Sequence, residues 1–563
     1  MNPPPALSLC PLCLCGFLFF ATEAERTQRP VFEEVLPARS HIIWTHDNAM
    51  SPQRYMPETM GPGCAFLDYN NDGWMDIYLV NSGPSDFYKP AKILKNALYR
   101  NNRDGTFTDV TDQARVGGGT FGMGVAAADY DKDGYTDILV TSYGKCLLYH
   151  NNKDGTFSSV ADAAGVSAPG WTTSAVWFDY DNDGFLDLFL CSFVEFGADK
   201  NIFCGQNKLG QPYYCIPRTF KPTHSFLFRN QGNGTFKETD EGTAIARALG
   251  KALGVVATDI NNDGLSDLFV ANDTVQNFLF VNRGGDRWDE IALAADVGFS
   301  AHGQPRSGMG VDAADIDGDG WQDLFVANVD QEIFSLYRNN RDQSFTDTAH
   351  LHDVAEATRL LSGWGLKFLD FDNDGATDLF LANGHPDDMI DRYSARVKYR
   401  EPPLLFHNDA GKLVNISDTA GHVFERSFPA RGLAAGDFNN DGKIDVLVAS
   451  NGQAPTLLEN CWGSDHHWVG VRLQGVKSNS EGIGARISWS AGGVQRSRLK
   501  TGGGSYLSSH DPREVLGIGQ AEKVEWVEVK WPGPSGRLEK FVNPPIDQYI
   551  RIREGRAADF TAR

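Results

Sequence analysis

Seven short segments of this 563-residue chain place carboxylate and amide oxygens at the same spacing. The first runs from Asp68 to Asp76, and every copy fits the pattern D-x-[DN]-x-D-G-x-x-D. A Ca²⁺ ion takes six or more oxygen ligands. Side chains at positions 1, 3, 5 and 9, a carbonyl oxygen at position 7 and a glycine at position 6 for the sharp bend meet that need. The sequence therefore predicts up to seven Ca²⁺ sites with a structural role.

The predicted ligands are four side chains and the position-7 carbonyl in each copy. In chain order they are Asp68, Asn70, Asp72, Trp74, Asp76; Asp129, Asp131, Asp133, Tyr135, Asp137; Asp179, Asp181, Asp183, Phe185, Asp187; Asp259, Asn261, Asp263, Leu265, Asp267; Asp315, Asp317, Asp319, Trp321, Asp323; Asp370, Asp372, Asp374, Ala376, Asp378; and Asp437, Asn439, Asp441, Lys443, Asp445. Three copies carry Asn at position 3 and lose one negative charge. We expect these three to bind Ca²⁺ more weakly.

Two other structures have similar acidic segments. An EF-hand loop needs a bidentate Glu at position 12 and a helix on each side, whereas position 12 here is apolar, as at Leu79 and Val140. Asp, Asn and Gly also form tight turns without any metal. A turn, however, needs no acid at position 9, and clustered carboxylates repel one another unless a cation neutralises them. We therefore expect calcium loops between strands.

The overall charge agrees with bound cations. The formal net charge is -22, and the predicted ligand positions alone hold more acid than this excess. Seven Ca²⁺ ions would reduce the net charge to about -8, an ordinary value for a soluble protein. A nucleic-acid-binding protein is expected to present a basic face, so the composition argues against a nucleic-acid partner.

The segments around each predicted loop read as four short strands. In the first unit these are 61–67 before the loop, 77–80 after it, a third ending at Asn102, and a fourth at 106–110. Asn-Asn-x-Asp-Gly between the last two is a strong hairpin signal. Successive loops begin 61, 50, 80, 56, 55 and 67 residues apart. Four strands at such a period indicate the blades of a β-propeller.

The two ends of the repeat region complement each other. The seventh unit lacks a fourth strand, and the N-terminal segment 31–35 is such a strand without a partner before it. Pairing the two would close a ring and remove exposed sheet edges. We therefore predict an all-β protein whose residues 30–462 form a seven-bladed propeller, with the N-terminal strand completing the last blade. The long steps between loops, at 204–215 and 384–403, are expected to be loop excursions on one face.

A different pattern begins at residue 465. Alternating strands at 467–473 and 484–489, a turn at 491–493, and strands at 524–531 and 549–552 indicate a small all-β domain over 465–553. Residues 554–563 read as a tail.

The N-terminus reads as a secretory signal peptide at 1–24. Residues 6–21 form a short apolar run followed by small and polar residues. The run is too short for a membrane span, and none of Cys10, Cys13 and Cys15 follows a lipobox. We expect a secreted or extracytoplasmic protein with no transmembrane segment after the signal is removed.

Six cysteines remain in the mature chain. Cys204 and Cys215 flank an insertion rich in Gly, Pro and Asn, and we expect a disulfide between them. Such a link would stabilise the chain by roughly 2–3 kcal/mol. Cys64, Cys146 and Cys191 lie in or beside apolar runs and are expected to be buried thiols, while the pairing of Cys461 is left open.

The repeats resemble the FG-GAP (VCBS-type) units of integrin α-subunit propellers. The C-terminal stretch resembles the ASPIC/UnbV domain, with Gly482-Ile483-Gly484-Ala485, Gly503-Gly504-Ser505-Tyr506-Leu507-Ser508 and Asp511-Pro512-Arg513. Together they resemble the cartilage acidic protein family, with details such as Pro57-Glu58-Thr59-Met60-Gly61 similar to bacterial members. The resemblance implies secretion and calcium binding. The EGF-like module of the animal proteins is absent here, so the resemblance by itself does not imply their matrix roles.

Three functional hypotheses follow from the sequence. No nucleophile motif, phosphate loop, CxxC or HExxH occurs, so a non-enzymatic binding or adhesion module for an extracellular protein or glycan is the first. The alternative is a carbohydrate-active enzyme of the lyase or dehydratase type, using a polar cluster of Asn383–Asp388, His224 and His302–Arg306 as acids and bases. A purely structural matrix component is the third. Tryptophans at 74, 171, 177, 321 and 364 could stack on sugars, but packing between blades is the expected use.

Overall fold

The computed structural model describes residues 30–208, 210–463 and 465–556. The predicted signal peptide and residues 557–563 of the predicted tail lie outside the described residues. The repeat region forms seven antiparallel four-stranded sheets. The first strand of every sheet contacts the first strands of its two neighbours, so the sheets close into a ring around a central axis. The predicted all-β seven-bladed propeller is confirmed.

Apart from the outermost strand of the last blade, each blade uses its strands in chain order, from the axis outward. The strands of blades one to four are β2 (Cys64–Leu67), β3 (Asp76–Leu79), β4 (Ala97–Asn101), β5 (Phe107–Asp109); β6 (Phe121–Ala128), β7 (Asp137–Tyr143), β8 (Leu147–Asn151), β9 (Phe157–Ser159); β10 (Thr172–Phe178), β11 (Asp187–Ser192), β12 (Phe226–Asn230), β13 (Phe236–Glu238); and β14 (Ala252–Thr258), β15 (Asp267–Asn272), β16 (Phe278–Asn282), β17 (Trp288–Glu290). The acidic loop always joins the first strand to the second.

The remaining three blades follow the same plan. Their strands are β18 (Val311–Ala314), β19 (Asp323–Val326), β20 (Ser335–Asn339), β21 (Phe345–Asp347); β22 (Gly363–Leu369), β23 (Asp378–Asn383), β24 (Leu404–Asp409), β25 (Lys412–Asn415); and β26 (Ala430–Gly436), β27 (Asp445–Ser450), β28 (Thr456–Asn460), β1 (Phe32–Glu34). Strand β1 pairs antiparallel with β28, with Phe32 opposite Asn460. The N-terminal strand therefore completes the last blade, as the sequence predicts.

Helical elements are short and lie in the connections. They are α1 (Pro37–Ser40), α2 (Thr111–Ala114), α3 (Ala161–Ala164), α4 (Ala244–Arg247), α5 (Val354–Ala357) and the 3-10 turns η1 (Met56–Thr59), η2 (Ala198–Lys200), η3 (Pro217–Thr219), η4 (Ala349–Leu351), η5 (Ile390–Arg392), η6 (Ser417–Thr419) and η7 (His422–Glu425). None of the helices in the described ranges is long and apolar enough to span a membrane.

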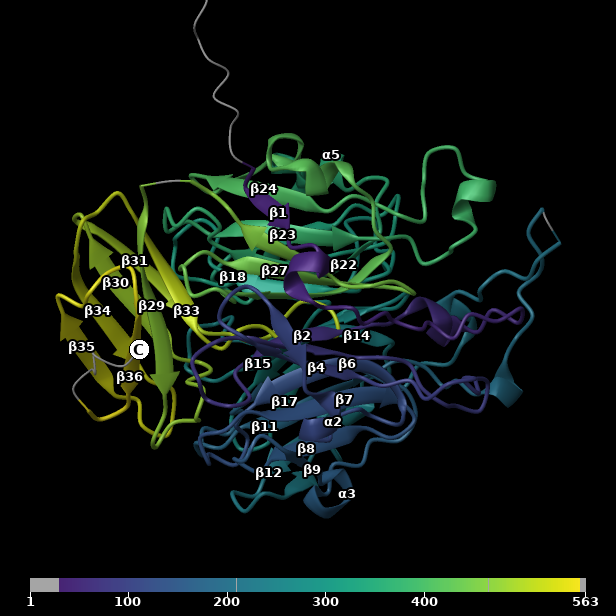
Figure 1. Ribbon diagram of the computed structural model, residues 1–563, viewed down its shortest axis with the longest axis horizontal. Helices are drawn as coiled ribbons and strands as arrows, with labels where there is room; N and C mark the ends of the chain where they lie inside the picture. Colours follow the sequence, from purple (N-terminus) through teal and green to yellow (C-terminus); the bar gives the residue numbers. More distant parts are fainter. Residues whose placement is uncertain (1–29, 209, 464, 557–563) are drawn as a thin grey trace, which may run out of the picture.

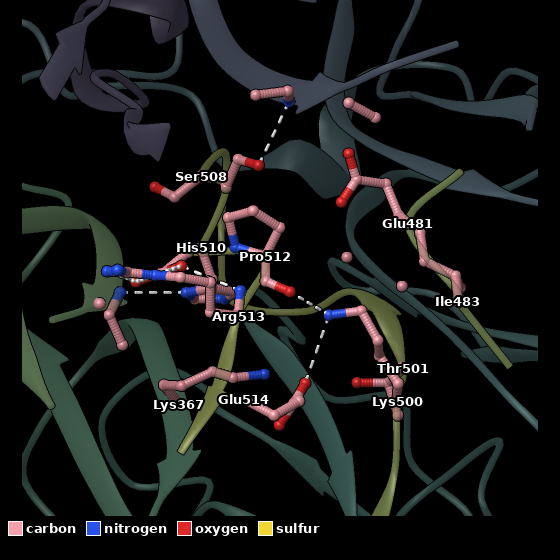
Figure 2. A pocket seen from close by; sticks show the side chains of 18 of the residues that line it. Lys367, Glu481, Ile483, Lys500, Thr501, Ser508, His510, Pro512, Arg513 and Glu514 are labelled. Carbon is pink, nitrogen blue, oxygen red and sulfur yellow. Dashed lines mark hydrogen bonds and ion pairs between the residues drawn. The ribbon is translucent and has the colours of Figure 1, made fainter. Parts of the chain in front are cut away.

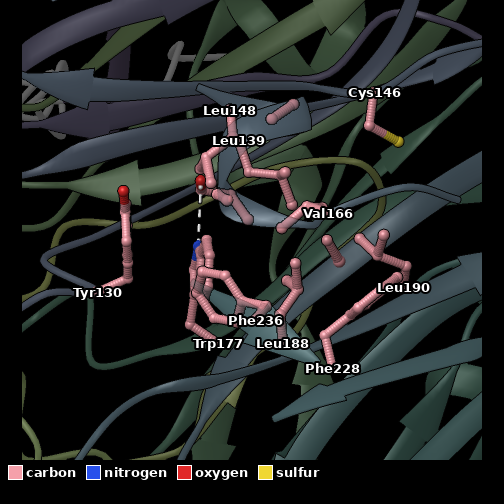
Figure 3. Close-up of a cluster of buried hydrophobic side chains, with 14 of the residues drawn as sticks. Tyr130, Leu139, Cys146, Leu148, Val166, Trp177, Leu188, Leu190, Phe228 and Phe236 are labelled. Carbon is pink, nitrogen blue, oxygen red and sulfur yellow. Dashed lines mark hydrogen bonds between the residues drawn. The ribbon is translucent and has the colours of Figure 1, made fainter. Parts of the chain in front are cut away.

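Apolar side chains fill the spaces between neighbouring blades. Between blades two and three, Tyr130 stacks on Trp177 with ring centroids 5.9 Å apart, and Phe236 packs beside them (Figure 3). Trp177 also donates a hydrogen bond from Nε1 to the carbonyl oxygen of Ala126. Trp171, Trp177 and Trp364 are buried. These tryptophans serve packing, as expected from the sequence.

The C-terminal region forms two small sheets that share one apolar core. Its strands are β29 (His467–Gln474), β30 (Arg486–Ala491), β31 (Val494–Leu499), β33 (Glu514–Gly519), β34 (Val524–Lys530), β35 (Leu538–Val542) and β36 (Tyr549–Arg553). One sheet has the order β33-β29-β36 and the other β31-β30-β34-β35. This domain lies against one end of the ring (Figure 1).

A segment of the C-terminal domain enters the centre of the propeller. Residues 502–511, which we call the plug, include the two-residue strand β32 (Gly502–Gly503), paired with β14 of blade four. The plug forms backbone or side-chain hydrogen bonds with the first strand of every blade. Side chains of Tyr506 and Leu507 are buried in the hub. Propeller and C-terminal domain therefore form one interlocked structure, which the sequence analysis did not predict.

Glycines allow the plug to lie close to the inner strands. A Cβ atom on Gly63 of blade one would collide with the carbonyl oxygen of Leu507. Gly503 has a φ of 69°, a left-handed conformation that side chains disfavour. The glycine-rich composition at both places thus reflects close approach of two backbones.

The two predicted excursions lie on the same face, opposite the C-terminal domain (Figure 1). Tyr213 of the first excursion contacts Tyr393 of the second, with ring centroids 6.0 Å apart. Cys204 and Cys215 form the predicted disulfide, with sulfur atoms 2.05 Å apart. Cys64, Cys146 and Cys191 are free and buried, and Cys461 is free and half-buried.

Replacing the central side chain of the plug should destabilise the whole protein. Tyr506 is fully buried, donates a hydrogen bond to the carbonyl oxygen of Met60 and packs on Trp364. We expect Tyr506→Ala to lower the free energy of unfolding by about 3–5 kcal/mol, measured by urea denaturation. The control Leu538→Ala, at a largely exposed position of the same domain, should change it by less than about 0.5 kcal/mol. Equal changes in the free energy of unfolding for the two variants would show that the plug does not hold the fold together.

Candidate metal centres

The predicted ligands at positions 1 to 7 lie in the loop between the first and second strands of a blade, and position 9 is the first residue of the second strand. In the first loop, Asp68 accepts hydrogen bonds from the backbone N–H groups of Asp72 and Gly73, at 2.9 and 3.0 Å. Asn70 accepts a second bond from the N–H of Asp72, and Asp72 accepts one from Trp74. These bonds curl the backbone around the three side chains.

The aspartate at position 9 has a backbone role in all seven loops. One oxygen of Asp76 accepts the N–H of Tyr69, and the other accepts the N–H of Asn101 on the third strand, at 2.8 Å. The same pair of bonds recurs at Asp137, Asp187, Asp267, Asp323, Asp378 and Asp445. The premise from sequence that a turn needs no acid at position 9 is therefore incomplete, because this carboxylate also joins loop and blade.

Burial without a counter-ion disfavours the ionised form of these acids. It raises the pKa of Asp129 to about 8, with the nearby Glu481 carboxylate adding to the shift. It likewise raises the pKa of Asp179 to about 8, with Asp183 and Asp181 adding to it. The pKa of the fully buried Asp370 is also raised well above its usual value, by burial and by the carboxylate of Asp378. A cation or protons must offset this concentration of charge.

The donor sets fit a hard cation. Oxygens of Asp129, Asp131 and Asp133 lie within 4.8 Å of one another. Oδ1 of Asp370 is buried and accepts no hydrogen bond from the described residues. Arginines and lysines pair with carboxylates of several loops, as Arg341 does with Asp319 (2.7 Å). Clustered oxygens from Asp, Asn and a backbone carbonyl are the ligands that Ca²⁺ prefers.

Two loops have a histidine beside them that the sequence analysis missed. Nδ1 of His150 lies 3.3 Å from Asp137 and 3.4 Å from Asp131. Nδ1 of His407 lies 3.2 Å from Asp378, and this contact contributes most to raising the pKa of His407 to about 9. Each histidine stands just before the last asparagine of the third strand, and that fixed position is the signal that could have found it.

That asparagine ties each blade to the one before it. Asn151 Nδ2 donates to the carbonyl oxygen of Thr136 in its own loop and to that of Tyr69 in the preceding loop, at 3.1 and 2.8 Å. The same double contact recurs at Asn101, Asn230, Asn282, Asn339, Asn408 and Asn460. From sequence we interpreted this residue only as part of a hairpin signal.

The loops also contact one another directly. The position-4 side chain of one loop donates to the position-6 glycine carbonyl of the next, as Asn71 does to Gly134 at 2.6 Å. Asn182, Asn262, Asn373 and Asn440 repeat the bond, the last of them back to Gly73 of the first loop. Position 4 has positive φ, as at Asn71 (57°), which asparagine tolerates better than most residues. The seven loops thus form a nearly continuous belt.

The C-terminal domain covers this belt. Arg472 forms an ion pair with Asp68 at 3.0 Å, and Tyr549 donates to Oδ2 of Asp437 at 2.8 Å. Arg513 donates to the carbonyl oxygen of Asp437 and lies against the ring of Tyr549. The state of the loops and the seating of the C-terminal domain are therefore physically linked.

A cavity of about 150 Å³ lies between the plug and the inner strands (Figure 2). Charged side chains of both domains line it, among them Lys367, Lys500 and Glu514. Lys367 is paired with Asp312 at 3.0 Å, and Lys500 lies 3.5 Å from Glu514. Nε2 of His510 forms no hydrogen bond with the described residues, and burial lowers the pKa of His510 well below its usual value. Paired charges make this cavity part of the domain contact.

The polar cluster proposed from sequence is not assembled. His385 is buried, accepts the N–H of Asp387 at Nδ1 and lies 3.4 Å from Asp330, so it fixes the loop around it. Arg306 pairs with Asp347 of its own blade, and His302 is exposed. His224 lies beside Asp240 at the outer side of blade three. In the part of the chain that the structure describes, these residues therefore lie in separate places and do not form one site.

The fold and its loops define a class: a seven-bladed β-propeller with repeated acidic loops, plugged by a second β-domain. Family models agree. The FG-GAP-like repeat matches residues 68–140, 129–190, 219–270, 259–326 and 315–381, and ASPIC and UnbV matches residues 475–559. The chain belongs to the family of FG-GAP-like repeat proteins that carry an ASPIC and UnbV domain, which confirms the resemblance seen in the sequence.

Curated relatives share both a name and modest identity. Cartilage acidic protein 1 of Xenopus tropicalis is 25% identical over 356 residues, covering 57% of this chain and 51% of that protein. Cartilage acidic protein 1 of Homo sapiens is 24% identical over 290 residues, covering 50% of this chain and 40% of that protein. This chain therefore spans about half the length of the relatives it matches, or less.

Solved structures with a similar arrangement are more distant. An Agrocybe aegerita lectin that recognises non-reducing terminal N-acetylglucosamine has a TM-score of 0.37 at 18% identity, covering 63% of this chain and 79% of its own. BBS1N in complex with ARL6DN has 0.41 at 10%, covering 77% and 99%. The exotype rhamnogalacturonan lyase YesX has 0.35 at 11%, covering 71% of each. None of them assigns a ligand or activity to this chain.

Removing one asparagine tie should destabilise the ring far more than removing its neighbour. Asn151 is fully buried and holds two blades together, whereas the adjacent Asn152 is exposed and bonds only within its hairpin. We expect Asn151→Ala to cost about 2–4 kcal/mol, since it leaves buried carbonyl groups without donors. Asn152→Ala should cost less than about 1 kcal/mol. Urea denaturation of both variants measures the difference, and similar costs would show that the tie between blades is dispensable.

Proposed function

We propose that this protein is a secreted, non-enzymatic binding module in which Ca²⁺ stiffens the propeller and one open face binds an extracellular protein or glycan. The proposal rests on how the two faces differ. The C-terminal domain covers the face with the acidic loops, so the opposite face, with its long excursions, is the one open to a partner (Figure 1).

The observation that carries the proposal is the excursion closed by Cys204 and Cys215. Ile202, Phe203 and Ile216, which flank the segment closed by the disulfide, are exposed by 44, 68 and 56%. Large apolar side chains grouped on one exposed loop mark an interaction site more often than isolated ones do. The disulfide limits how far these side chains can move, and a rigid loop loses less entropy on binding.

Contacts at the base of the excursion hold it in place. Tyr214 donates to Oε2 of Glu58 at 3.0 Å, and the Arg54 guanidinium lies 4.1 Å from the centre of the Tyr214 ring. Arg54 also pairs with Asp387 and Asp388 of the second excursion. The open face is therefore a set of mutually braced loops, which suits recognition of a partner of fixed shape.

The acidic loops support structural calcium. Asp68, Asn70, Asp72 and Asp76, with the carbonyl of Trp74, would hold one ion, and the equivalent residues would hold the others. Bound cations would supply the positive charge that the buried carboxylates lack. With an affinity near 10⁻⁴ M, millimolar calcium would contribute about 1.4 kcal/mol for each loop. Export through the predicted signal peptide would bring the loops into calcium of that concentration.

Calcium and protons should act as alternatives in stabilising the loops. With chelator, folded-state pKa values near 8 at Asp129 and Asp179 exceed the unfolded value of about 4, so the folded state binds more protons and loses stability as the pH rises towards 8. We expect the melting temperature in chelator to be higher at pH 6 than at pH 8. Millimolar calcium should raise it strongly at pH 8 and less at pH 6. A melting temperature at pH 8 that is the same in chelator and in millimolar calcium would overturn the calcium proposal.

Binding should depend on the open face. Screening the calcium-loaded protein against glycans and secreted proteins should yield a selective ligand. We expect Phe203→Ser to weaken its affinity at least tenfold, about 1.4 kcal/mol, whereas Leu538→Ser, which alters an equally exposed residue of the C-terminal domain, should not. A ligand insensitive to Phe203→Ser would place the interface elsewhere. Polysaccharide turnover that is lost in His385→Ala would instead support the enzyme alternative.

A further inference from the structure

A histidine and two carboxylates meet on blade three, outside the seven acidic loops. His224 precedes β12, Glu238 ends β13 and Asp240 follows two residues later. Because β12 and β13 pair antiparallel, with Phe228 opposite Glu238, these residues come to the same end of one hairpin. Nε2 of His224 lies 4.0 Å from Oδ2 of Asp240, and one donor atom from each of the three residues lies within 4.8 Å of the others.

Asp240 is not satisfied by the protein around it. Its side chain is buried, and its Oδ1 accepts no hydrogen bond from the described residues. Within the described chain, neither Asp240 nor Glu238 forms an ion pair with a lysine or arginine. Asp240 is flanked by Glu238, whose carboxyl group hydrogen-bonds with it, and by His224. A buried carboxylate with no donor at one oxygen and a second acid beside it is costly, so the position favours a positively charged partner.

The fold does not require an acid at this position. The equivalent residue, four after the first buried residue of the outer strand, is Thr111 in blade one and Ser417 in blade six. Their hydroxyls accept the N–H of Leu98 and of Leu405, each at 2.9 Å. Asp240 makes no such bond to the equivalent Leu227 among the hydrogen bonds of the described residues. The acid of blade three therefore has a role different from that of its counterparts.

We propose that His224, Glu238 and Asp240 form a binding site for a divalent transition metal of the Zn²⁺ class. Imidazole nitrogen combined with carboxylate oxygens suits Zn²⁺, whereas Ca²⁺ takes oxygen ligands alone. Metal–ligand bonds of about 2.0–2.1 Å bring neighbouring ligand atoms to roughly 3.3 Å in a tetrahedron. The half-exposed His224 and the exposed Glu238 need to move only slightly towards the fixed Asp240 to reach that separation.

The exposed side of this site gives it an open coordination position. Three protein ligands leave one place for water or for a donor atom of another molecule. The site is distinct from the acidic loops, whose oxygens lie at the inner end of each blade under the C-terminal domain. Millimolar calcium should therefore fill the loops without competing for the histidine site.

Metal binding to calcium-loaded protein tests the proposal. Isothermal titration with Zn²⁺ in millimolar calcium should give a site in the wild-type protein whose affinity falls at least about tenfold in His224→Ala and in Asp240→Asn. Co²⁺ in the wild-type protein should give the visible absorption of a nitrogen- and oxygen-ligated ion, lost in both variants. His422→Ala is the matched control, because His422 is exposed and its one acidic partner among the described residues is Glu425 at 3.3 Å. This variant should bind as the wild type does.

Two results would overturn the site. Equal Zn²⁺ affinity in the wild type, His224→Ala and Asp240→Asn would place any bound metal elsewhere, including at His150 or His407 beside the acidic loops. Absence of a site in the wild-type protein would show that the carboxylates of blade three remain metal-free. Glu238→Gln, at an exposed position, removes one ligand charge without disturbing the core and should weaken binding in the same direction, which guards against a fold defect in Asp240→Asn.

Discussion

The open inner edges of seven sheets set the main constraint on this protein. Each first strand presents backbone N–H and C=O groups to the central axis, where they need hydrogen-bond partners once water is excluded. The plug, residues 502–511, meets strands of all seven blades there, with Ser505 alone bonding to blades five, six and seven. A segment of a second domain thereby completes the first, and the two cannot be understood as separate units.

The negative charge of the acidic loops is the second constraint, and it also acts at the contact between the propeller and the C-terminal domain. Buried aspartates of adjacent loops are joined by asparagine bonds and covered by Arg472, Arg513 and Tyr549 of the C-terminal domain. Any ion held in a loop changes the field that these cationic and phenolic groups experience. Metal binding in the ring and the seating of the C-terminal domain are therefore linked, and by the reciprocity of linked equilibria each changes the equilibrium of the other by the same factor.

Sequence periodicity was sufficient for the parts of the fold that repeat. Blade number, the closing strand at Phe32 and the Cys204–Cys215 disulfide follow from local signals and from what each end of the repeat lacks. The plug could not be predicted, because the run at Gly502 reads like any flexible turn, and its partners lie on seven distant strands. An asparagine recurs at the position of Asn151 in every repeat, but the sequence indicates only a hairpin there. Nothing in one chain segment shows that the side-chain amide of this residue reaches another blade. Asp240 was overlooked because a single acid at a strand end carries no pattern.

The location of the closing elements has a consequence for biosynthesis. Strand β1 is made first but has to wait for β28, more than 400 residues later, and the plug follows after that. A chain emerging from its amino end therefore carries six blades whose inner edges lack their final partner, and exposed sheet edges promote aggregation. The fold is therefore completed last, by the C-terminal part of the chain. A chain that ends before residue 500 would have all the repeats but not the plug that holds their inner strands together.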